Sequence, residues 1–134
     1  MKNEAIQLKC AGVPEHFNHP WQMALEDHSF IKKGIDLRWS YNGGGTGAMA
    51  KDLRDGKIDM AILLTEGALS EIAQGNKLKI ISFYVDSPLI WGVHTGIKSN
   101  ITHSKYLNDK PFLISRYNSG SHLMAHVHAK RNGF

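Results

Sequence analysis

The stretch GIDLRWSYNGGGTGAMAKDLRDGKIDMAILLTEG, residues 34–67, decides the fold. Apolar and polar side chains alternate over residues 35–42, and this period of two predicts a β-strand. A glycine-rich turn and a predicted helix over residues 46–57 follow. The nearly continuous apolar run over residues 58–66 then predicts a strand that is covered on both faces, as strands of a parallel sheet are.

The same succession of elements extends in both directions from this stretch. The other predicted strands are residues 6–13, 77–96 and 111–118, and the other predicted helices are residues 19–34, 67–76, 102–110 and 119–133. Strands that alternate with helices are typical of a mostly parallel sheet with helices on both faces. The sequence therefore predicts an α/β fold.

The charge and hydropathy patterns exclude several classes of protein. The chain of 134 residues has a net charge of +4, but its Lys and Arg are scattered without a run of like charges, so we expect no nucleic-acid interface. No segment approaches the roughly 18 apolar residues of a membrane span, so we expect no membrane insertion. Residues 1–14 lack the apolar stretch of a signal peptide. We expect a cytoplasmic protein, or a periplasmic one if a signal sequence has been removed.

The residue types that carry chemistry do not form a catalytic or metal-binding set. The single cysteine, Cys10, lies in an apolar run and is interpreted as a small core residue. His122 and His126 are four residues apart on the last predicted helix, but HLMAH lacks the glutamate of HExxH and no third ligand is evident. Ser87 and Ser119 do not lie in a nucleophile-elbow sequence. We therefore expect no catalytic residues, no metal and no cofactor.

Polar or glycine-rich turns follow the predicted strands. They are GVPEHFNHPW (residues 12–21), NGGGTG (42–47), LTEG (64–67) and VDSPL (85–89). Because ligands of open α/β sheets bind beyond the carboxyl ends of the strands, these turns are expected to converge on one crevice. The glycines expose backbone N–H groups, and a helix that begins near Thr46 leaves its first amides unpaired, which favours a carboxylate, sulfonate or phosphate. A plain strand-to-helix turn is the alternative, since neither GxxxxGK[ST] nor GxGxxG is present.

Two further groups of side chains are candidates for this crevice. Thr65 and Glu66 could offer a hydroxyl and a carboxylate to a ligand, or they could simply cap the helix that follows. Phe17, Trp21 and Trp91 could provide aromatic walls, although each could equally belong to the core.

Four segments carry a resemblance to a known family: residues 12–39, 44–67, 84–94 and 114–125. In these segments the chain resembles the type 2 periplasmic-binding fold. The closest likeness is to the ABC-transporter substrate-binding proteins that include sulfonate, nitrate and thiamine-pyrimidine-precursor binders. The resemblance implies two lobes that close on a small-molecule ligand like a hinged clamp. Residues 1–96 would form lobe one with its first crossing strand, and residues 97–134 an incomplete lobe two.

The resemblance also implies which residues bind the ligand. They are Pro14, His16, Phe17, Asn18, Gly44, Gly45, Thr46, Thr65, Glu66, Ser87, Ser119, Gly120 and Ser121. Such a protein binds a small organic, anionic or neutral solute without transforming it, and delivers it to an ABC permease if it is exported.

The chain departs from that family in length, because family members continue well beyond the first strand and helix of lobe two. We therefore expect residues 114–133 to pack against lobe one or against a second copy of the chain, as a homodimer. Two alternatives stay open. One is a cytosolic enzyme similar to a thiamine-pyrimidine synthase, or a ligand sensor, although one cysteine cannot supply that synthase's cysteine-rich motif. The other is an oligomeric interaction module.

Overall fold

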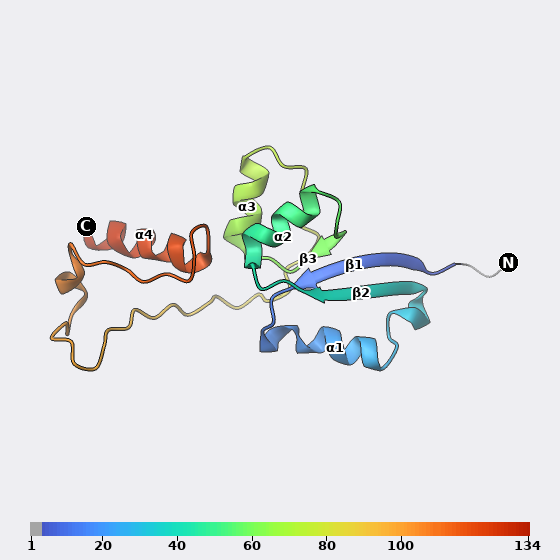
Figure 1. Cartoon of the computed structure of the whole chain (residues 1–134), viewed down its shortest axis with the longest axis horizontal. Helices are drawn as coiled ribbons and strands as arrows, with labels where there is room; N and C mark the ends of the chain where they lie inside the picture. The colour runs from blue at the N-terminus through green and yellow to red at the C-terminus, as the bar shows by residue number, and fades with distance from the viewer. Residues whose placement is uncertain (1–3) are drawn as a thin grey trace. The chain divides into compact units, whose positions relative to one another are not determined.

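The computed structural model describes residues 4–134 (Figure 1). Its strands are β1 (Ile6–Gly12), β2 (Ile35–Tyr41) and β3 (Met60–Ala61). Its α-helices are α1 (His19–Glu26), α2 (Gly45–Arg54), α3 (Thr65–Ala73) and α4 (Gly120–Asn132), and its 3-10 helices are η1 (His16–Asn18), η2 (Ile31–Lys33) and η3 (Ser104–Leu107). The chain divides into two compact units, Met1–Ser82 and Phe83–Phe134. The sequence had placed this division after residue 96.

The first unit contains a parallel sheet with the strand order β2-β1-β3. Ile6 pairs with Ile35 at one end of β1, and Cys10 pairs with both Trp39 and Met60 near the other end. The connections from β1 to β2 and from β2 to β3 run in opposite directions across the sheet. Right-handed crossovers therefore require α1 and α2 to lie on opposite faces, as Figure 1 shows. The predicted α/β fold is confirmed.

The core of this unit lies at the carboxyl end of β1. Cys10 and Ala50 are 0% exposed and Met49 is 1% exposed, so β1 and α2 supply most of the buried apolar surface. On the other face, the indole of Trp21 in α1 stacks on that of Trp39 in β2, with ring centroids 5.3 Å apart. The interpretation of Cys10 as a core residue is confirmed, and its burial raises the pKa of the thiol to about 11.

Two predicted elements of the first unit are shorter than expected. The helix predicted over residues 19–34 is interrupted, because His28 has a φ of 61° and cannot continue α1. Gly34, with a φ of 77°, then ends η2 as predicted. The strand predicted over residues 58–66 is only Met60–Ala61, since α3 already begins at Thr65. Arg54 and Glu71 form an ion pair that joins α2 to α3.

The second unit contains one α-helix and no strand within residues 83–134. The strands predicted over residues 77–96 and 111–118 are therefore wrong. A strand needs a neighbour that satisfies its N–H and C=O groups, and apolar sequence cannot supply one. Helix α4 was predicted correctly. The Ser119 hydroxyl caps its first turn by accepting from the amide of His122 at 3.2 Å, and Gly133, with a φ of 75°, ends it.

Candidate functional site

The turns that follow β1, β2 and β3 meet at one edge of the sheet. The amide of Asn42, after β2, donates to the carbonyl of Gly12 at 2.9 Å. After β3, the amide of Leu64 donates to the hydroxyl of Thr46 at 3.4 Å. Gly67 lies so close to Thr46 that an added Cβ would be 2.2 Å from its methyl group. The contacts bring residues 12–18, 42–47 and 64–67 together, and we call this cluster of turns the strand-end edge.

Asn18 is the most enclosed polar residue of the strand-end edge. Its side chain is 0% exposed, and its Nδ2 donates to the carbonyl of Val13 at 2.8 Å. Its Oδ1 is buried and accepts no hydrogen bond from residues 4–134, and the buried Nε1 of Trp39 donates none to them. Gly12 lies between these two side chains, because a Cβ there would be 2.7 Å from the Trp39 ring and 2.8 Å from Asn18 Nδ2. A buried acceptor and a buried donor are thus available at this edge.

The glycine-rich turn differs from the prediction. The amide of Gly44 donates to Asn42 Oδ1 at 2.9 Å, and the amide of Gly45 donates to the Asn42 carbonyl at 3.2 Å. The expectation that Gly44 and Gly45 offer free N–H groups is therefore wrong. The cause is Asn42, whose side chain folds back on the following backbone as an Asx-turn and is itself held by Asp52 at 2.9 Å. Gly45 has a φ of 68°, which a residue with a side chain rarely adopts.

Two amides of α2 remain available after this rearrangement. Within residues 4–134, the N–H groups of Thr46 and Gly47 donate to no acceptor. Thr46 itself is 9% exposed, whereas Gly47 is exposed to solvent. Any anion held by the start of α2 would therefore meet these two amides rather than those of Gly44 and Gly45.

Thr65 and Glu66 open α3 at the same edge. Leu64, and not Thr65 or Glu66, is the N-cap of α3, and its side chain makes no capping hydrogen bond. Glu66 is half-buried in the first turn, where the helix dipole stabilises a carboxylate. Within residues 4–134, neither side chain makes a hydrogen bond or an ion pair.

The turn after β1 carries the other predicted residues of the first unit. Pro14 and His16 are exposed, and Phe17 is half-buried with its ring edge-on to His16 at a centroid distance of 5.9 Å. Trp21, proposed as a wall of the crevice, instead belongs to the aromatic stack on Trp39.

Three predicted serines and Gly120 belong to the second unit, and their membership of the site stays a prediction. Ser87 is exposed. The buried Ser119 hydroxyl donates to the carbonyl of Arg116 at 2.7 Å and caps α4, and it lies 2.9 Å from the Ser121 hydroxyl. Ser119 and Ser121 therefore already have structural roles at the start of α4.

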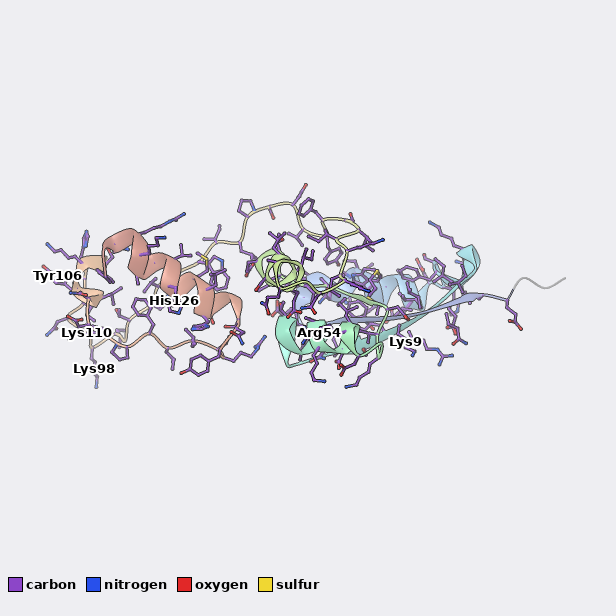
Figure 2. The ribbon with its side chains drawn as sticks, turned by 90° about the horizontal axis from the view of Figure 1, so that it is seen from above. Lys9, Arg54, Lys98, Tyr106, Lys110 and His126 are labelled. Atoms are coloured by element: carbon purple, nitrogen blue, oxygen red, sulfur yellow. The ribbon has the colours of Figure 1, made fainter. Side chains whose placement is uncertain are left out.

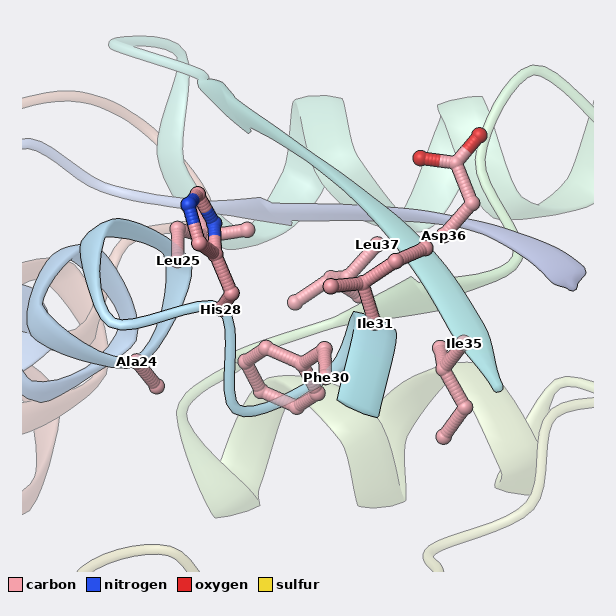
Figure 3. A pocket seen from close by; sticks show the side chains of 8 residues that line it. All are labelled: Ala24, Leu25, His28, Phe30, Ile31, Ile35, Asp36 and Leu37. Carbon is pink, nitrogen blue, oxygen red and sulfur yellow. The ribbon is translucent and has the colours of Figure 1, made fainter. Parts of the chain in front are cut away.

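A hollow of about 410 Å³ lies at the opposite end of β2 from the strand-end edge (Figure 3). It is lined by Ala24, Leu25, His28, Phe30, Ile31, Ile35, Asp36 and Leu37. The lining is mostly apolar, and the carboxylate of Asp36 points away from Phe30 and Ile35. The hollow forms where the chain leaves α1 at His28. The hollow was not predicted, because residues 19–34 were interpreted as one continuous helix.

The described part of the chain contains no group of three or more His, Cys, Asp or Glu placed to hold a metal ion. None of the helices within residues 4–134 is both long and apolar enough to cross a membrane. No family model, no curated protein and no solved structure matches the chain.

Proposed function

We propose that the chain binds a small organic solute at the strand-end edge and does not transform it. The observation that carries this proposal is the buried Oδ1 of Asn18, which has no hydrogen-bond donor within residues 4–134. An unsatisfied buried acceptor costs about 1–3 kcal/mol, and a ligand N–H or O–H would recover this energy. The exposed residues Pro14 and His16 are the part of the turn that would move aside to admit the ligand.

The remaining groups of the strand-end edge define the chemistry of the solute. The free amides of Thr46 and Gly47 favour a carboxylate, sulfonate or phosphate on one side of the ligand. Glu66 and Asn18 favour an N–H or O–H group on another side. A solute that combines an acidic group with an amine, amide or hydroxyl group would satisfy both. The resemblance to substrate-binding proteins supports the same class of ligand.

Thermal-shift screening tests this proposal with carboxylates, sulfonates, pyrimidines and amino acids. A ligand at a hundred times its dissociation constant stabilises the folded state by about 2.7 kcal/mol, which raises the melting temperature by several degrees. No shift with any member of the panel would contradict the proposal.

Two substitutions of Gly47 test whether its backbone amide contributes to the thermal shift. Gly47→Pro removes the amide donor of the third residue of α2, and we expect it to abolish the shift for acidic ligands. Gly47→Ala keeps the amide, and its added Cβ meets no atom within 4 Å, so the shift should persist. Equal shifts in the two variants would exclude this amide from the site.

A second function is favoured by the apolar surface of the second unit. Ile90, Ile97 and Leu113 are completely exposed, with relative exposures of 100%, 101% and 101%. Exposed apolar surface of this kind is typical of an interface, and a second copy of the chain is the partner that we propose. Light scattering coupled to size-exclusion chromatography should then give a dimer that Ile90→Asp dissociates. A monomer at high protein concentration would contradict the dimer and leave solute binding unaffected.

A further inference from the structure

Two histidines on α4 face each other through their ring nitrogens. His122 and His126 are four residues apart, so their side chains lie on the same face of the helix. The Nε2 atoms of the two rings are 3.1 Å apart, and the ring centroids are 4.8 Å apart. His126 is exposed on α4 (Figure 2), and His122 is half-buried. Solvent therefore reaches the pair.

The separation of these nitrogens matches the bite of one metal ion. A zinc–imidazole bond is about 2.0–2.1 Å long. Two such bonds place their nitrogens about 2.9 Å apart when they meet at a right angle, and about 3.4 Å apart at the tetrahedral angle. The observed 3.1 Å between His122 and His126 lies between these limits. The distance between the two nitrogens therefore suits one shared cation.

The hydrogen bond of Asn118 fixes how the rings are protonated without a cation. The backbone amide of Asn118 donates to Nδ1 of His122 at 3.1 Å. Nδ1 of His122 is therefore an acceptor, so its proton sits on Nε2 in the neutral ring. Nε2 of His122 therefore donates a hydrogen bond to Nε2 of His126. This hydrogen bond keeps the two nitrogens at a distance that also suits a shared cation.

We propose that His122 and His126 form a binding site for one late first-row divalent cation, with water molecules as the other ligands. Neutral imidazoles suit Cu²⁺, Ni²⁺ and Zn²⁺, and the Irving–Williams order places Cu²⁺ first. Binding moves the proton of His122 from Nε2 to Nδ1, with no net change in the number of protons on the neutral ring. The amide of Asn118 then loses its acceptor, so the cation is coupled to the turn that begins α4.

The third histidine of α4, His128, has other contacts and does not join this pair. His128 is the next histidine, but its ring packs against Phe112 at 5.8 Å and its Nε2 lies 3.4 Å from Asn132. It therefore serves as a matched control on the same helix. The sequence alone gave the spacing of His122 and His126, but it could not give the distance between their nitrogens.

Copper titration of the full chain tests the site. Electron paramagnetic resonance of the one-to-one Cu²⁺ complex should show two equatorial nitrogens, and calorimetry should give the dissociation constant. His126→Ala leaves a single imidazole. We expect binding at least tenfold weaker and a one-nitrogen spectrum, because the second ligand otherwise acts at a high effective concentration. His128→Ala should change the dissociation constant less than twofold. Equal affinity in His126→Ala and the unsubstituted chain would overturn the proposal.

A second measurement needs no substitution. Long-range ¹H–¹⁵N spectra distinguish the two neutral tautomers of histidine. Without metal, His122 should carry its proton on Nε2, and with Zn²⁺ it should carry the proton on Nδ1. An unchanged tautomer of His122 at saturating Zn²⁺ would show that the cation does not bind Nε2 of this ring, and the site would be excluded.

Discussion

The two compact units use similar apolar sequence with different results. In the first unit, β1 lies between two parallel neighbours, and its residues Cys10 and Ala11 are 0% and 1% exposed. In the second unit, Leu107 is the one apolar side chain that is buried among residues 83–134, and even Trp91 is 42% exposed. The comparison shows that apolar periodicity predicts a strand only where a neighbouring strand is present to pair with it. The first unit has its own core, whereas most of the large apolar side chains within residues 83–134 are exposed.

The largest loss of stability should follow a substitution in the core of the first unit. Met49 is 1% exposed, so Met49→Ala should reduce the free energy of unfolding by about 2–5 kcal/mol through the cavity that it leaves. Leu113, which is 101% exposed in the single chain, is the control in the second unit, and at protein concentrations at which the chain is monomeric Leu113→Ala should change stability by less than about 0.5 kcal/mol. Denaturation with urea measures both. Similar losses of unfolding free energy in the two variants would contradict the difference in packing between the two units.

The next largest loss of stability should follow a substitution in the closely packed strand-end edge. Gly12→Ala places a Cβ 2.7 Å from the ring of Trp39, and this overpacking should cost about 1–3 kcal/mol. Gly43→Ala adds a Cβ with no atom within 4 Å, so it should be neutral or stabilising by up to about 1 kcal/mol. Urea denaturation measures the free energy of unfolding of both variants. A Gly12→Ala variant as stable as the unsubstituted chain would mean that the turn after β1 is loosely packed.

These glycines also show how much of the site the sequence could predict. Residues 42–47 were correctly placed at the edge where the strand ends meet, because parallel order follows from the βαβ pattern. The roles of the amides were not predictable in the same way. Asn42 accepts from the Gly44 amide through its side chain and from the Gly45 amide through its backbone carbonyl, and the Asn-Gly pair was the signal that could have indicated these bonds.

The fold was predicted best where local sequence and pairing agree. The strands predicted over residues 6–13 and 35–42 are β1 and β2, each shorter by its last residue, and α4 runs from its Ser119 cap to Gly133. The break at His28 was missed, because an αL residue other than glycine leaves little trace in the hydrophobic pattern. The strand over residues 77–96 was overpredicted, because its sequence carries no information about a partner.

A smaller effect is expected in the second unit, at the start of its helix. Ser119→Ala removes the side-chain cap of α4, which should cost about 0.5–2 kcal/mol of helix stability. Ser87→Ala, at an exposed position, is the matched control. Circular dichroism at 222 nm during heating should show earlier loss of helix in the first variant alone. Identical melting curves would mean that α4 does not depend on its cap.

The last test is at Cys10, which reports on the first unit alone. Burial raises the pKa of its thiol to about 11, so at pH 8 only about one thousandth of it is the reactive thiolate. Because the folded-state pKa is the higher one, the folded chain loses stability as the pH rises from 9 towards 11. Labelling with a thiol reagent at pH 8 should be negligible until the first unit unfolds in urea. Rapid labelling of the native chain would place Cys10 in contact with solvent.

The proposed solute would bind where the strand ends meet, with Asn18 as its buried acceptor. Two-dimensional ¹H–¹⁵N spectra of the chain, recorded while a stabilising ligand is added, locate the bound solute. We expect the largest shifts at the side-chain amide of Asn18 and at the backbone amides of Thr46 and Gly47. Shifts confined to Leu25, His28 and Ile31, which line the hollow at the other end of β2, would contradict binding at the strand ends.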